Sequence, residues 1–159
     1  RSLSRRLEPR AAAPERRLRT IRALVDQGVP VGVSVAPQIP FINEDMEQVL
    51  EAASAAGATS AFYTVLRLPW EVAPLFREWL SLHYPQRAER VMARVQEMRG
   101  GKDYDSAFGT RMKGQGTWAA LIHQRFEKTC RRLGLNREKT MLDPSAFRVP
   151  SAGQQGVLF

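Results

Sequence analysis

Residues 31–40 read VGVSVAPQIP, and this stretch decides the fold that the sequence predicts. Valines alternate here with Gly32, Ser34 and Ala36, which is the period-two pattern of a β-strand. One face of the strand is therefore branched and apolar. The other face is small, so a ligand has room to lie against it. Two prolines bracket the loop at 37–40, where the strand should end.

Helix and strand alternate around this stretch. Apolar residues at three-to-four spacing predict helices over 14–27 and 43–57, and a glycine ends each of them. Asn43 is the expected N-cap of the second helix. A second strand is predicted over 61–68. This order indicates a βα repeat with a parallel sheet and a right-handed crossover.

After Pro69 the apolar period is helical throughout. It predicts three helices, at 72–80, 88–98 and 118–133, and a long loop at 102–116. The sequence thus divides into three parts: βα units over 1–69, a helical extension over 70–136 and an irregular tail over 137–159.

The composition favours one ordinary domain, with 159 residues of which 43% are hydrophobic. The sequence has no apolar run of roughly 18 residues and no leader-like start, which predicts a cytoplasmic protein that does not span a membrane. One cysteine excludes an internal disulfide framework. One cysteine and two histidines are too few ligands for a closed metal site, so no metal ligands are assigned.

The net charge of +8 is unevenly spread along the chain. Residues 1–22 and 85–159 carry balances of +6 and +7, whereas residues 23–84 carry −5. Clustered arginines suit a polyanion, and they are equally typical of a solvated surface. One basic stripe at helical spacing is the candidate nucleic-acid-binding set, with a solvated helix face as the other interpretation: Arg87, Arg90 and Arg94.

Four segments in fixed order resemble the carboxyl-terminal portion of radical SAM proteins of the DNA repair photolyase branch, which is related to spore photoproduct lyase. They are LEPRAAAPERRLRTIRALVDQGVPVGVSVAPQIPFIN, SAFYTVLRLPWEVAPLFREWL, RAERVMARVQEMRGGKDYDSAFGTRMKGQG and FEKTCRRLGL. The resemblance covers residues 7–150. It implies an α/β fold, namely the carboxyl-terminal part of a partial (β/α)6 TIM-like barrel followed by a helical extension.

The resemblance also implies two cofactors, a [4Fe–4S] cluster held by a CxxxCxxC loop and S-adenosylmethionine, which the cluster cleaves reductively. This sequence has no such loop, which by resemblance lies upstream of Arg1. The chain alone is then expected to bind no cluster and to be inactive. The resemblance assigns the adenosyl cradle to the backbone of Ala36, Pro37, Gln38 and Ile39.

Three further residues are candidates at this site. Arg10 has a forked guanidinium that suits the methionine carboxylate of the cofactor, and it is equally typical of a solvated arginine. Tyr63 and Arg67 are the candidate catalytic residues, because strand alternation places them on one face near the strand end. Facing a barrel interior they would touch substrate or pass a hydrogen atom. Facing outward they would pack beneath a helix.

The last five residues, QGVLF, are similar to the QLxLF peptide with which bacterial DNA-handling enzymes dock on the sliding clamp. Gln155, Leu158 and Phe159 match the pattern, whereas Gly156 departs from it and should weaken binding. A frayed tail is the other interpretation of this segment.

Two classes of function follow. The first is the distal part of a radical SAM enzyme, lyase-like and acting in DNA repair, although the substrate need not be nucleic acid. The alternative is a non-catalytic nucleic-acid-binding or adaptor module that uses its arginine-rich faces. Two strands make a small sheet, so the open strand edge also predicts self-association.

Overall fold

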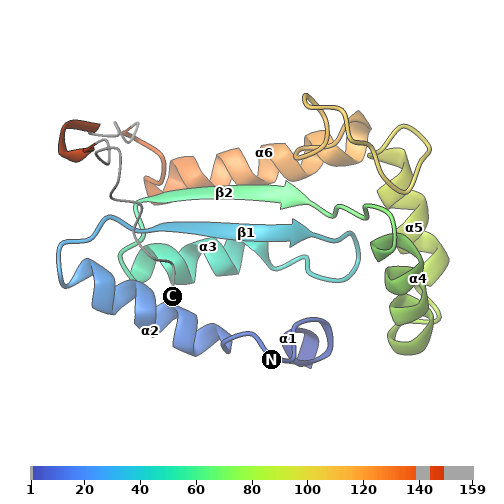
Figure 1. Cartoon of the computed structure of the whole chain (residues 1–159), viewed down its shortest axis with the longest axis horizontal. Helices are drawn as coiled ribbons and strands as arrows, with labels where there is room; N and C mark the ends of the chain where they lie inside the picture. The colour runs from blue at the N-terminus through green and yellow to red at the C-terminus, as the bar shows by residue number, and fades with distance from the viewer. Residues whose placement is uncertain (1, 139–143, 149–159) are drawn as a thin grey trace, which may run out of the picture.

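Two parallel strands lie at the centre of the computed structural model, which describes residues 2–138 and 144–148 (Figure 1). Strand β1, Gly32–Gln38, and strand β2, Ser60–Val65, are connected by helix α3, Met46–Ala55. They pair in parallel, and the register shifts once after Val35 meets Tyr63. The predicted strands and their parallel order are confirmed.

The remaining helices flank this unit. They are α1 (Ser2–Leu7), α2 (Pro14–Val25), α4 (Val72–His83), α5 (Ala88–Glu97), α6 (Gly116–Leu133) and the short 3-10 helix η1 (Pro144–Ala146). The three helices predicted after Pro69 are present. Helix α1 was not predicted, because its six residues carry no clear apolar period.

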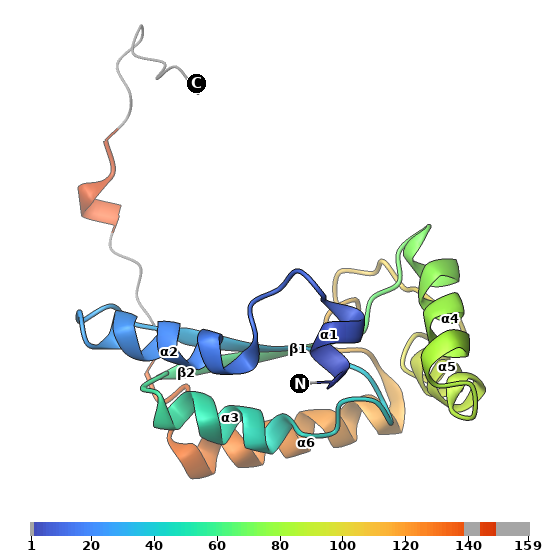
Figure 2. The ribbon, with the colours of Figure 1, turned by 90° about the horizontal axis from the view of Figure 1, so that it is seen from below.

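Helices α3 and α6 cover the same face of the two-stranded sheet (Figure 2). Leu50 of α3 and Phe126 of α6 pack there with Val35 and Tyr63 of the strands, and all four are buried. A second buried cluster lies around α4 and α5. There Leu80 and other apolar side chains of these helices pack against Ile39 and Leu68, which follow β1 and β2. The core therefore sits on one side of the sheet and beyond its carboxyl end.

The opposite face of the sheet is exposed. Gly32, Ser34 and Ala36 of β1 are exposed there, and Phe62 of β2 is 55% exposed. Within the described residues, the small face predicted from the sequence is therefore accessible. Parallel sheets in closed barrels or doubly wound folds are covered on both faces, so this open face is unusual for parallel strands.

The predicted barrel architecture is wrong. The described residues contain two parallel strands in one open sheet, and no (β/α)6 arrangement is seen. The apolar periodicity correctly located helices and strands because it is a local property. Barrel closure depends on strand number and stagger, which a local pattern does not report.

Helix α2 also departs from expectation. Its apolar stripe predicts a buried helix face, yet none of its residues is buried and Leu24 is 41% exposed. Its main close contact is at the end of α3, where a Cβ on Gly57 would lie 2.8 Å from Val25 Cγ1. Gly57 has φ 102° and leaves room for this approach.

No helix in the described part of the chain combines the length and the apolar character that a membrane crossing needs. The cytoplasmic location stays a prediction.

Candidate functional site

Asn43 holds the loop that follows β1. Its Oδ1 accepts a hydrogen bond from the Ile39 N–H at 2.7 Å, and its Nδ2 donates to the Pro37 carbonyl at 2.7 Å. The N-cap prediction for Asn43 is wrong, because α3 is preceded by Asp45 in that position. The amide side chain closes the loop onto itself instead.

The predicted adenosyl cradle is mostly committed to internal hydrogen bonds. Gln38 is 6% exposed, its Nε2 donates to the Val35 carbonyl at 2.9 Å, and its own carbonyl accepts from the Leu66 N–H. Ile39 is 1% exposed. Of the four cradle residues, Ala36 alone is exposed. The segment can therefore offer a shaped surface at Ala36, but few free hydrogen-bonding groups at 37–39.

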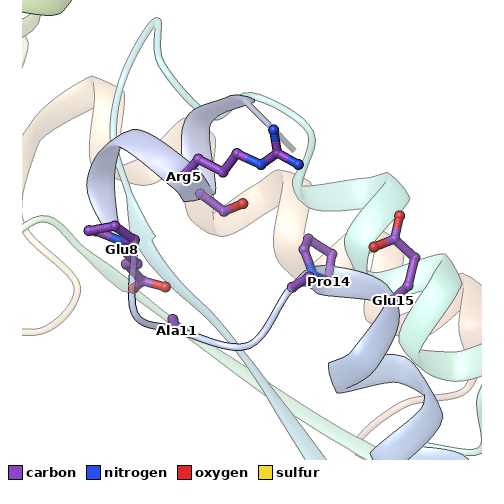
Figure 3. Close-up of a pocket in the computed structure, with 8 residues that line it drawn as sticks. Arg5, Glu8, Ala11, Pro14 and Glu15 are labelled. Carbon is purple, nitrogen blue, oxygen red and sulfur yellow. The ribbon is translucent and has the colours of Figure 1, made fainter.

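Arg10 lies in the loop between α1 and α2 and is exposed. The same loop borders a hollow of about 410 Å³, which Figure 3 shows with Arg5, Glu8 and Glu15 around it. Glu8 is paired with Arg17 at 2.8 Å. Arg10 does not line this hollow, and charges of both signs do, so the hollow gives no support to an anion site at Arg10.

Tyr63 packs beneath α6, which is the second of its two predicted placements. Its ring lies 4.7 Å from the Phe126 ring and 6.3 Å from the His123 ring, centre to centre. The Lys113 ammonium lies 3.7 Å from the centre of the Tyr63 ring, a cation–π distance. Tyr63 is 1% exposed, and its hydroxyl has no hydrogen-bond partner among the described residues.

Burial shifts the ionisation of this group of side chains. It raises the pKa of Tyr63 to about 12, with the charge of Glu127 adding to the effect. It lowers the pKa of Lys113, which the Glu127 charge partly offsets. Burial also raises the pKa of the Cys130 thiol to about 11, so this thiol is a poor nucleophile.

Arg67 follows the end of β2 and does not share the surroundings of Tyr63. One of its guanidinium nitrogens donates to the Tyr104 hydroxyl at 3.1 Å and another reaches Met112 Sδ at 3.7 Å. Both partners belong to the 102–116 loop. Arg67 therefore holds this loop, and the two candidate catalytic residues are in different environments.

The arginines of the predicted stripe are engaged by the protein itself. Arg87 donates to the Phe41 carbonyl at 3.0 Å, the Arg90 guanidinium stacks 3.9 Å from the centre of the Phe41 ring, and Arg94 pairs with Glu97. Arg87 and Arg90 thus attach α5 to the loop after β1, and Arg94 is paired within α5.

Sequence reasoning missed two residues that organise these sites and gave a third the wrong role. Lys113 and His123 join Tyr63 at one pocket, and Asn43 closes the loop after β1. A lysine directly before a glycine-rich end of a long loop was the available signal for Lys113, but its approach to Tyr63 depends on tertiary packing. The clamp-binding candidates Gln155, Leu158 and Phe159 lie outside the described residues.

The described residues contain no group of three or more His, Cys, Asp or Glu side chains placed to hold a metal ion. The one cysteine of the chain, Cys130, is buried. The residues of this chain therefore do not fit a [4Fe–4S] cluster.

Comparison with family models, with curated proteins and with solved structures found no match to this chain.

Proposed function

We propose that this chain is the distal part of a radical SAM enzyme, lyase-like and acting on nucleic acid, with its cluster-binding cysteines supplied by a segment upstream of Arg1. The order and spacing of the four resembling segments over residues 7–150 carry this proposal. The cluster would supply the electron that cleaves S-adenosylmethionine.

The surface around β1 supports a binding role for this chain. The face made by Gly32, Ser34 and Ala36 is small and exposed, so a flat adenosyl group has room to lie against it. Asn43 fixes the loop at the strand end, which keeps the shape of this surface. In the proposal Ala36 contacts the cofactor, whereas Pro37, Gln38 and Ile39 set the path of the loop.

Replacing Ala36 tests this role. In the full natural protein, Ala36→Leu should fill the small face and weaken S-adenosylmethionine binding by at least about tenfold, measured by calorimetry. Ala23→Leu changes an exposed alanine of α2 in the same way and should leave binding unchanged. Equal affinities of Ala36→Leu and the unchanged protein would contradict the placement.

The non-catalytic nucleic-acid-binding function is a second candidate, and helix α2 favours it. No residue of α2 is buried, and Arg16, Arg19 and Arg22 are exposed along it. Exposed arginines on one helix can neutralise phosphates. This alternative therefore relies on α2 rather than on the engaged arginines of α5.

A comparison of the two helices tests the alternative. Replacing the three α2 arginines with glutamine should lower affinity for a single-stranded oligonucleotide and reduce its salt dependence, measured by fluorescence anisotropy. The same replacement of Arg87, Arg90 and Arg94 should change binding much less. Equal effects of the two replacements would contradict a site on α2.

A further inference from the structure

The outer edge of β2 borders a pocket that the proposed function does not use. Helix α6 runs alongside β2 (Figure 1), and the pocket lies between Tyr63, Lys113 and the α6 residues Ala119 and His123. Its volume is about 360 Å³. That is within the size range of small-molecule sites.

The chain closes this strand edge on both sides of Tyr63. Asn136 bonds to the Ala61 N–H at 2.8 Å, and the Met112 carbonyl accepts from the Val65 N–H at 2.9 Å. Of the residues between these two bonds, Tyr63 lines the pocket. The strand is therefore held by hydrogen bonds on both sides of Tyr63.

Tyr63 lines this pocket, and its buried hydroxyl lacks a partner within the described part of the chain. Tyr63 is 1% exposed, and no described residue bonds to its hydroxyl. Buried polar groups in native proteins are almost always hydrogen-bonded. An unpartnered hydroxyl on a residue that lines a pocket therefore favours a ligand atom that accepts its hydrogen bond.

The beginning of α6 adds a second feature at the same place. Gly116 lines the pocket and starts this 18-residue helix. Gln115 makes no side-chain capping bond, and the first turn contains no acidic residue. The positive end of the helix is thus uncompensated by side chains, which favours a negative group nearby.

Lys113 adds a full positive charge. Its ammonium lies 3.7 Å from the centre of the Tyr63 ring and forms no ion pair with the described residues. His123 also lines the pocket. The opposing charge is Glu127, one helical turn beyond His123 and exposed. Lys113 and the first turn of α6 therefore give this pocket its positive charge.

We propose that this pocket binds the oxyanion of a small molecule, a phosphate or carboxylate whose remainder is apolar. The oxyanion lies between Lys113, the first turn of α6 and the Tyr63 hydroxyl, which donates to it. Ala119 and Ala120 also line the pocket and suit an apolar body. This inference is independent of the proposed function, which uses the opposite face of the sheet.

A titration followed by ¹H–¹⁵N NMR on the full chain tests the site, with inorganic phosphate in one arm and benzoate in the other. We expect saturable shifts at the amides of residues 114–118, with a dissociation constant of about 1 mM for probes this small. The arm that binds more tightly identifies the class of oxyanion. Shifts that do not saturate with either probe would overturn the proposal.

Three variants sharpen the result. Lys113→Met should weaken binding at least about tenfold, and Tyr63→Phe about threefold with an unchanged thermal midpoint. Lys128→Met removes an exposed α6 lysine outside the pocket and should have no effect. Equal weakening by Lys128→Met and Lys113→Met would show attraction to general positive charge, and the pocket would then be excluded as the site.

Discussion

Arg99 joins the end of β2 to the loop at 102–116. It is 2% exposed, and its guanidinium donates to the carbonyls of Thr110, Arg111 and Leu66 at 3.1, 2.8 and 2.6 Å. A fourth bond reaches the Val65 carbonyl at 3.3 Å. Burial lowers the pKa of this guanidinium. The buried Arg99 therefore helps to hold the loop that positions Lys113, together with Arg67.

We predict that Arg99→Met lowers the free energy of unfolding by about 2–4 kcal/mol, because it leaves buried carbonyls without a donor. Urea denaturation followed by circular dichroism measures the loss. Arg94→Met is the matched control on the same segment. Its pair with Glu97 is partly exposed and should contribute about 0–1 kcal/mol. Equal losses in the two variants would contradict the role of Arg99.

The buried phenol of Tyr63 should make the stability of the fold depend on pH in the alkaline range. Its pKa rises from 10.0 to about 12 in the folded protein, so the folded state favours the neutral phenol. This contribution to stability is complete below pH 10.0 and is lost as pH rises toward about 12. Tyr63→Phe should therefore show a flatter decline of the urea midpoint across that window. An equally steep decline in both proteins would contradict the buried phenol.

At the scale of elements, local sequence patterns were sufficient to locate most of the helices and strands. Val33 and Val35 alternate with small residues, and β1 is found where that pattern predicts it. Cys130 lies on an apolar stripe and is buried in the core. Asn43 shows the limit, since its side chain bonds to a loop instead of capping a helix. Tertiary contacts decided that outcome, as they decided the pairing of Lys113 with Tyr63.

The outer edge of β2 is protected by Asn136. Its Oδ1 accepts from the Ala61 N–H at 2.8 Å and its Nδ2 donates to the Ala61 carbonyl at 2.9 Å. Asn136 has φ 59°, a left-handed conformation that asparagine tolerates. The side chain thus occupies backbone groups that another strand would otherwise pair with.

We predict that Asn136→Gly lowers the free energy of unfolding by about 1–2 kcal/mol, because glycine keeps the backbone conformation but loses both bonds to Ala61. The freed edge should also increase self-association, measured by sedimentation. Arg137→Gly is the control for adding a glycine to the same loop. Self-association that rises equally in both variants would show that Asn136 does not guard the edge.

At the scale of the whole molecule, the sheet is covered on one face by α3 and α6 and is open on the other (Figure 2). Phe62, at 55% exposure, lies on the open face with Ser34 and Ala36. The sequence predicted that this face is small, and it did not predict how many strands the sheet contains. Strand count depends on long-range pairing, which no pattern within 31–40 encodes.

Anaerobic reconstitution of the full natural protein with iron and sulfide, followed by an assay of S-adenosylmethionine cleavage, tests the proposed function most directly. The proposal predicts a brown, oxygen-sensitive protein that releases 5′-deoxyadenosine under reducing conditions. The 159-residue chain treated in parallel should remain colourless, because its single cysteine cannot hold the cluster. A colourless full protein that leaves S-adenosylmethionine intact would contradict the account.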